Sequence, residues 1–263
     1  MKKPLLMLCA GLLLAAATAN AAKPKLINTT VDLSEGNYGP PLTSSLGTVS
    51  IGTVTIDRTL PAAAVDSPEP DPQYAAQQIG YYRKSYEYLV VLKNKTNEQF
   101  VREAVALALS QAGYAVVSNA AAADKTVDVK VSELWMWVTP MPDNRDRKQF
   151  YFAMTTEFSS DDKILNGIGA VAVNDFRNGS RDTNWKSYRN TIMHSMKGYL
   201  ANFNQALELS RSAANKAAAG QSQGSVTSLS QRLEELTQLR DSGVLTEDEY
   251  TELRSKVIAE SLE

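Results

Sequence analysis

The pattern of apolar and polar residues is most regular near the middle of the chain. Residues 88–92 form a continuous apolar run of strand length, which is typical of a strand covered on both faces. Thr96 followed by Gln99 has the capping-box pattern, so a helix should begin at about Asn97. The pattern therefore predicts a buried strand that leads directly into a capped helix.

This predicted helix has one apolar stripe and a defined end. Its apolar residues recur at helical spacing, at Phe100, Ala104, Leu107 and Ala108. Gly113 should end the helix, because the left-handed conformation after a helix costs glycine little. Residues 114–117 should then return as a strand. This strand–helix–strand unit is the scaffold of a two-layer domain.

Alternating apolar and polar residues predict several more strands. Residues 49–56 alternate with a change of phase near Gly52, which indicates a β-bulge. Residues 127–138 alternate at first and then become apolar on both faces. Further strands are expected at 150–158 and 164–173. Together these segments predict a meander that follows the central unit.

A long amphipathic helix should follow the meander, from about Thr183 to Ser212, with Asp182 as its N-cap. Small residues in the preceding strand should let this helix pack closely on the sheet. The buried face of the helix is predicted from apolar residues spaced close to 3.6 positions apart: Trp185, Tyr188, Ile192, Met196, Tyr199, Phe203 and Leu207.

Less regular segments separate the predicted elements. Residues 23–47 are interpreted as an extended arm, 61–78 as an exposed loop with several prolines, and 211–227 as a flexible linker of small and polar residues. The fold class predicted is α+β: a two-layer sandwich of a mixed or antiparallel sheet with two helices, plus a small C-terminal helical hairpin. The predicted division is a signal peptide at 1–21, an α/β domain at 22–210, the linker, and the hairpin at 228–263.

The N-terminus has the features of a secretory signal peptide. Lys2 and Lys3 precede an apolar run at residues 5–17, and Ala19-Asn20-Ala21 is an A-x-A cleavage site. Cys9 offers an alternative, a lipoprotein acylation site. The residue before it is Leu8, however, where a bacterial lipobox requires a small residue. We therefore expect export to the periplasm, with association with the outer membrane left open and no further membrane span.

Charge and cysteine content exclude several classes of function. Removing residues 1–21 takes away two of the 27 basic residues and none of the 29 acidic ones, which leaves a formal charge of −4. Non-specific nucleic-acid binding needs a basic surface, so no nucleic-acid partner is expected. The single cysteine leaves with the signal peptide, so the secreted chain has no disulfide, thiol nucleophile or thiolate metal ligand.

The candidate chemistry is sparse, and we expect no enzyme activity and no cofactor. His194 is the only histidine and should lie on the polar side of the long helix. No G-x-S-x-G elbow and no phosphate loop appears in the sequence. The acidic clusters at 143–147 and 159–162 could bind calcium, but they lack the EF-hand order and fit ordinary turns better.

Two further groups of residues could form a ligand or partner face. Arg177 and Arg181 lie before the long helix, where they could bind an anion or join a local ion-pair network. Trp135 and Trp137 share one face of their strand. Packing in the core is the default interpretation of these tryptophans, and an exposed recognition strip is the alternative.

The order of elements resembles that of YajG-type outer-membrane lipoproteins. The resemblance covers roughly residues 26–210 and rests on Asp57-Arg58, Ile79-Gly80 and Ala112-Gly113-Tyr114 within that order. It implies a periplasmic accessory domain. The poor lipobox departs from the pattern of the family and puts membrane anchoring in doubt.

The C-terminal residues resemble the SHOCT (short C-terminal) domain. Thr246 and Glu249 form a capping box there, and Gly243 should end the helix before it. Such a short hairpin has a poor core of its own, so its apolar residues should pack on a copy or a partner. The residues expected at this interface are Leu233, Leu236, Leu239, Tyr250, Leu253 and Val257.

Two hypotheses of function follow. In the first, the protein is a non-enzymatic periplasmic accessory protein that associates with itself or with another envelope protein through the hairpin. In the second, it binds a ligand or an envelope polymer through Trp135 and Trp137 or through the arginines.

The leader predicts a specific processing site. We expect export followed by cleavage after Ala21 and no acyl chain. Ala19-Asn20-Ala21 fits the cleavage site of a signal peptide, whereas the residues before Cys9 do not fit a lipidation site. The intact mass of protein recovered from the envelope should match a chain that begins at Ala22. A diacylated species that begins at Cys9 would contradict this.

Overall fold

The central unit folds as the apolar pattern predicts. The computed structural model describes residues 24–41, 45–58, 70–83, 87–141, 147–179 and 184–241 and four positions between 246 and 253. In it, β4 (Glu87–Leu92) leads into α1 (Asn97–Gln111). Thr96 Oγ1 accepts a hydrogen bond from the Gln99 N–H at 3.1 Å, and Gln99 Oε1 accepts one from the Thr96 N–H at 2.8 Å. Gly113 has a φ of +96°, and β5 (Ala115–Val116) follows it. The predicted capping box and glycine end are confirmed.

The described strands form one mixed sheet of eight, with β6 (Lys125–Pro140) at its centre. Along one edge, β6 pairs antiparallel with β7 (Lys148–Ser160), and β8 (Ala170–Gly179) pairs with β7. The predicted α+β class is confirmed.

The other edge of β6 is shared by two strands. β2 (Thr48–Ile56) runs parallel to its first half, and β3 (Gln78–Arg83) runs parallel to it near Met136. β5 extends the sheet beyond β2, while β4 and then β1 (Lys25–Thr29) extend it beyond β3. The sheet thus has two wings on this side, and both depend on β6.

One backbone N–H and one arginine side chain complete the pairing of β6 where β2 ends and β3 has not yet begun. The Asp57 N–H donates to the Val131 carbonyl at 3.0 Å. Arg58 Nη1 donates to the carbonyls of Leu134 at 3.3 Å and Gln78 at 2.7 Å. The guanidinium therefore satisfies carbonyl groups that the strand ladder leaves open.

The close approach of β3 to β6 requires a glycine at position 80. A Cβ atom on Gly80 would lie 2.7 Å from the Met136 carbonyl oxygen and 2.8 Å from Met136 Cβ. Both contacts are too short for real atoms, and the carbonyl belongs to the backbone of a central strand, which cannot move easily.

The predicted bulge in β2 is confirmed, because the register with β6 shifts between Ile51 and Val54. Its loosened backbone groups have side-chain partners. Asp128 Oδ1 accepts from the Thr53 N–H at 2.6 Å, and Arg102 Nη1 donates to the Ile51 carbonyl at 3.0 Å. The last of these bonds also ties α1 to the sheet.

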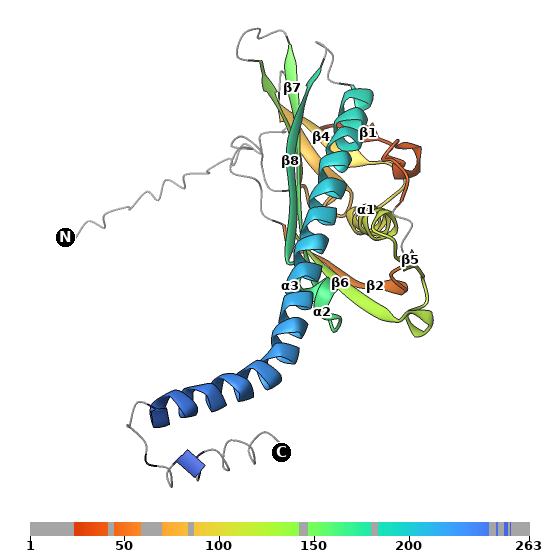
Figure 1. Ribbon diagram of the computed structural model, residues 1–263. Coiled ribbons are helices and arrows are strands. Elements are labelled where there is room, and N and C mark those ends of the chain that lie inside the picture. The colour runs from red at the N-terminus through yellow and green to blue at the C-terminus, as the bar shows by residue number, and fades with distance from the viewer. Residues whose placement is uncertain are drawn as a thin grey trace, which may run out of the picture.

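The helices α1 and α3 (Trp185–Asp241) cover the same face of the sheet (Figure 1). Of the predicted buried face of α3, only Trp185 is largely exposed, at 44%. The Tyr199 hydroxyl shares a hydrogen bond with Thr156 Oγ1 at 2.8 Å, and burial raises the pKa of Tyr199 above its ordinary value. The other predicted residues are all buried: Tyr188, Ile192, Met196, Tyr199, Phe203 and Leu207.

Several predicted boundaries are wrong. The arm predicted at 23–47 contains β1 and the short helix η1 (Leu33–Glu35), and the end of the 61–78 loop runs into β3. Part of the strand predicted at 164–173 is instead the short helix α2 (Lys163–Asn166), which Asp162 caps. A further short helix, η2 (Ala120–Ala122), precedes β6.

The long helix does not end near Ser212. α3 continues to Asp241 and therefore runs through residues 211–227, where the sequence predicts a flexible linker. This segment is rich in alanine, whose helix propensity is the highest of all residues, and a favourable helix start already precedes it. The small and polar residues at 211–227 make the segment poor in apolar residues, but they do not prevent it from forming a helix.

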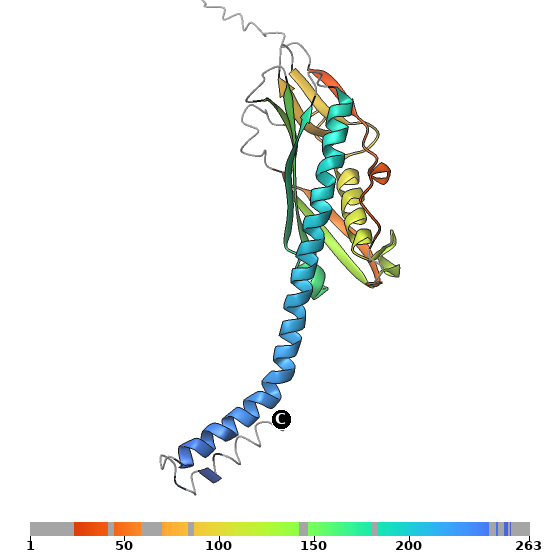
Figure 2. The same ribbon diagram turned by 45° about the horizontal axis from the view of Figure 1, so that its top comes forward.

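Among the side chains of α3 that the structure describes, Ser210 is the last that is buried in the body. Ser210 Oγ donates to the Ile164 carbonyl at 2.6 Å, and Leu207 is 1% exposed. Beyond this point α3 projects away from the sheet and curves (Figures 1 and 2). At 1.5 Å per residue, the projecting part is about 45 Å long.

Gly80→Ala should destabilise the body. We expect the free energy of unfolding to fall by about 1–3 kcal/mol or more, because the new methyl group overlaps the Met136 backbone. Chemical denaturation of a chain of residues 22–263 measures this change in free energy.

Gly198→Ala is the matched control, since its Cβ would lie 3.4 Å from Val173 Cγ2 and alanine favours the helix. This control should be neutral or slightly stabilising. Equal effects of the two changes would show that β3 does not need the close approach.

Candidate functional site

The projecting end of α3 contacts a second short helical segment. Thr237 Oγ1 and the Tyr250 hydroxyl lie 3.3 Å apart, and the Arg240 guanidinium lies 4.7 Å from the centre of the Tyr250 ring. The Tyr250 N–H donates to the Thr246 carbonyl at 3.0 Å, which is one turn of helix. The structure therefore places Tyr250 against the last turns of α3, as the predicted hairpin requires.

The apolar residues of this hairpin are incompletely covered. Leu233, Leu236 and Tyr250 are half-buried, and Leu253 is 38% exposed. The side chains of Leu239 and Val257, which the sequence also predicts at an interface, lie outside the described residues. No packed core covers the described apolar side chains of the hairpin.

Trp135 and Trp137 do not form an exposed strip. They are 0% and 5% exposed, so the core alternative is the one that the structure shows. They pack with Tyr81, Leu89 and Val91 on the sheet face opposite α1 and α3. Neither tryptophan can stack on an external ligand in this arrangement.

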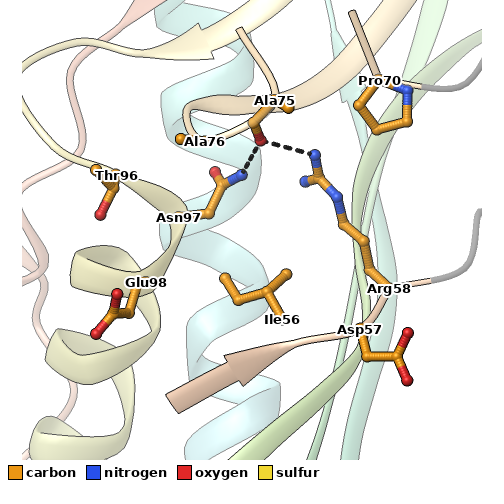
Figure 3. Close-up of a pocket in the computed structure, with 9 residues that line it drawn as sticks. All are labelled: Ile56, Asp57, Arg58, Pro70, Ala75, Ala76, Thr96, Asn97 and Glu98. Atoms are coloured by element: carbon orange, nitrogen blue, oxygen red, sulfur yellow. Dashed lines mark hydrogen bonds between the residues drawn. The ribbon is translucent and has the colours of Figure 1, made fainter. Parts of the chain in front are cut away.

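One cleft lies between the end of β2 and the start of α1, with a volume of about 450 Å³ (Figure 3). Arg58 and Asn97 reach the Ala75 carbonyl from two sides, each at 3.2 Å. Asn97 Nδ2 also donates to the Gln78 carbonyl at 3.1 Å. Both side chains hold the segment before β3 in place, so the polar groups of this cleft serve the sheet junction.

Arg58 also lies over the indole of Trp135, with 5.3 Å between Cζ and the ring centre. This cation–π contact and the three carbonyl partners fix the guanidinium in one orientation. The polar side chains of the cleft in Figure 3 are therefore explained by their role in the fold.

A second cleft lies beside α3 and brings Arg177 close to residues that the sequence did not connect with it. Its lining includes Arg189, His194 and Lys197 of α3. His194 is exposed, as predicted, but its Nε2 lies 3.2 Å from Asp175 Oδ2, a partner that the sequence pattern did not indicate. Arg181, the predicted companion of Arg177, lies outside the described residues.

The carboxylates near 159–162 act as caps and turn partners. Asp162 Oδ1 accepts from the Leu165 N–H at 2.9 Å, and Asp162 Oδ2 lies 3.0 Å from Lys125 Nζ. Burial raises the pKa of Asp162, but these hydrogen bonds and the lysine outweigh it and lower the pKa below its ordinary value. Hydrogen bonds from Thr48 lower the pKa of Asp124 in the same way. The interpretation as ordinary turns accounts for these groups.

The described residues include neither a metal-ligand cluster nor a helix suited to cross a membrane. Within them, no three histidine, cysteine, aspartate or glutamate residues are grouped as a metal site would need. Among the described helices, none combines the length and the apolar character that crossing a bilayer requires. Of the cluster at 143–147, only Arg147 is described.

No family model matches the chain, and no curated protein matches it. A protein of family DUF330 from Xanthomonas campestris has 8% identity and a TM-score of 0.40, over 74% of this chain and 99% of its own. An uncharacterized protein has 12% identity and a TM-score of 0.35, over 70% and 98%. A neuraminyllactose-binding hemagglutinin homolog from Helicobacter pylori has 7% identity and a TM-score of 0.32, over 69% and 98%. Similarities of this size do not place the chain in a family.

Arg58→Lys should lower the stability of the body although the charge is kept. Lysine lacks the planar fork, so carbonyls at the sheet junction lose their donors, at a cost of about 1–3 kcal/mol. Thermal and chemical unfolding of a chain of residues 22–263 measure this cost.

Arg147→Lys is the control, because Arg147 is exposed. This change should alter the free energy of unfolding by less than about 0.5 kcal/mol. If both variants unfold at the same denaturant concentration as the unaltered protein, Arg58 does not stabilise the junction.

Proposed function

We propose that the protein is a secreted, non-enzymatic accessory protein of the cell envelope that works by protein–protein association through its C-terminal hairpin. The observation that carries this proposal is the projection of α3, which places Leu233 and Leu236 roughly 35–40 Å along the helix beyond Ser210. A helix that served only the fold of the body could end soon after Ser210, the last buried residue among the side chains of α3 that the structure describes.

The incompletely buried residues of the hairpin favour association. Leu233 and Leu236 are half-buried and Leu253 is 38% exposed, on a unit too small for a core of its own. Burying a fully exposed side chain of this kind contributes about 1.5–3 kcal/mol, and burying the part that is still exposed contributes a fraction of this, so several together can offset the entropy lost on association. A second copy presents the same apolar residues, which makes self-association the simplest form of this function.

The location of the protein in the periplasm is part of the same proposal. The basic start, apolar run and A-x-A site at the N-terminus support secretion to the periplasm. The resemblance of the chain to YajG-type domains and of its end to the SHOCT domain supports an accessory role in the envelope. The partner is then a second copy or another envelope protein.

Leu236→Asp combined with Leu253→Asp should abolish association. Two carboxylates in the interface would require desolvation of charge without a partner, so we expect at least tenfold weaker self-association or loss of partner binding. Sedimentation equilibrium over a range of concentrations measures the mass, and cross-linking in cells followed by purification measures partner capture.

Leu209→Asp is the control, because Leu209 is 65% exposed on α3 but lies before the hairpin. This variant should leave the mass of the assembly in solution and the captured partners unchanged. Circular dichroism should show that the body stays folded in all variants. If the double variant keeps its mass and its partners, the hairpin is not the site of association.

A further inference from the structure

An open cleft of about 530 Å³ lies beside the first turns of α3, at the end of the helix far from the hairpin. Three parts of the chain bound it: residues 35–37 after η1, Arg177 near the end of β8, and the outer side of α3 between Arg189 and Lys197. Because these parts are far apart in sequence, only the folded body brings them together.

The carboxylates around this cleft already have partners. Glu35 forms an ion pair with Arg189. Asp175 Oδ2 lies 3.2 Å from His194 Nε2, and Asp175 Oδ1 accepts from the Phe176 N–H at 2.7 Å. These contacts engage both acidic groups and leave the other cations of the cleft without an acidic partner.

Arg177 and Lys197 are those remaining cations. Both side chains are exposed, and among the residues that the structure describes neither has a hydrogen bond or an ion pair. The secreted chain has a formal charge of −4, so the positive charge of this cleft is local and does not follow from the protein as a whole. An anion in the cleft would relieve the repulsion between the two cations.

We propose that the cleft binds a phosphoryl group through Arg177 and Lys197, with the Asn190 amide as a neutral donor. The arginine fork can donate two parallel hydrogen bonds to phosphate oxygens, and the lysine adds a point charge. Donors from three side chains suit a tetrahedral oxyanion better than a planar carboxylate. The volume leaves room for the group that carries the phosphate, which is either a soluble phosphorylated compound or the headgroup of an anionic lipid.

Calorimetric titration of inorganic phosphate into the secreted form, at low ionic strength, tests the site. Arg177→Gln with Lys197→Gln should weaken phosphate binding by about tenfold or more, since two charge-assisted contacts are lost. Acetate should bind at least about tenfold more weakly than phosphate to the unaltered protein.

The matched control is Lys186→Gln with Lys216→Gln, which removes the same charge from exposed positions of α3 outside the cleft. This control should bind phosphate like the unaltered protein. Equal losses in both double variants, equal binding of acetate, or no phosphate binding by the unaltered protein would overturn the proposal. Circular dichroism establishes that each variant is folded.

Vesicles distinguish the two sources of the phosphoryl group. Co-sedimentation with phosphatidylglycerol vesicles that is lost in the Arg177 and Lys197 variant, with none on phosphatidylcholine, assigns the cleft to a lipid headgroup. Phosphate binding without any vesicle binding assigns it to a soluble phosphorylated compound. This site rests on the cleft alone and is independent of association through the hairpin.

Discussion

The structure depends on the requirement that every backbone group of β6 finds a partner. This strand runs from Lys125 to Pro140 at the centre of the sheet, and no single neighbour pairs with its second edge over that length. β2 and β3 divide the edge between them, and the Arg58 guanidinium donates to the Leu134 carbonyl in the gap. An unpaired buried carbonyl costs free energy comparable to a lost hydrogen bond, so the two wings of the sheet are joined at this point.

The same junction explains why Arg58 and Gly80 occur in this chain. Arg58 also donates to the carbonyls of Ala75 and Gln78 and so fixes the start of β3, while Gly80 lets β3 reach β6 without overlap at Met136. Both residues belong to the short motifs that carry the resemblance to YajG-type domains. In this chain those motifs maintain the sheet, so they provide no evidence about a ligand or a reaction.

Local patterns predicted the elements whose signals are local. The Thr96 capping box, the bulge near Gly52 and the buried stripe of α3 each depend on residues a few positions apart, and all are confirmed. β1 was not predicted, because its place in the sheet depends on pairing with β4, far along the chain. β3 was also missed, although it pairs antiparallel with the neighbouring β4, and only its contact with β6 depends on a distant strand. Propensity within Lys25–Thr29 or Gln78–Arg83 contains little of that information.

The candidate sites divide in the same way. The sequence predicts a helical hairpin at the C-terminal end, but not that Tyr250 contacts Thr237 and Arg240 of α3. The placement of Arg177 and Lys197 in one cleft could not be predicted, because it depends on how β8 packs beside α3. Strand alternation alone placed Trp135 and Trp137 on one face but could not show that this face is covered.

The two proposed sites lie on one helix but are physically separable. The cleft is at the first turns of α3, and Leu233 and Leu236 of the hairpin lie roughly 35–40 Å along the helix beyond Ser210, several times the Debye length of about 8 Å at physiological ionic strength. Charge in the cleft therefore cannot act directly on the hairpin. Any coupling would have to pass through α3, whose Tyr199 and Phe203 are completely buried in the body. A helix anchored in this way keeps its position when the cleft fills, so we expect phosphate binding to leave association unchanged.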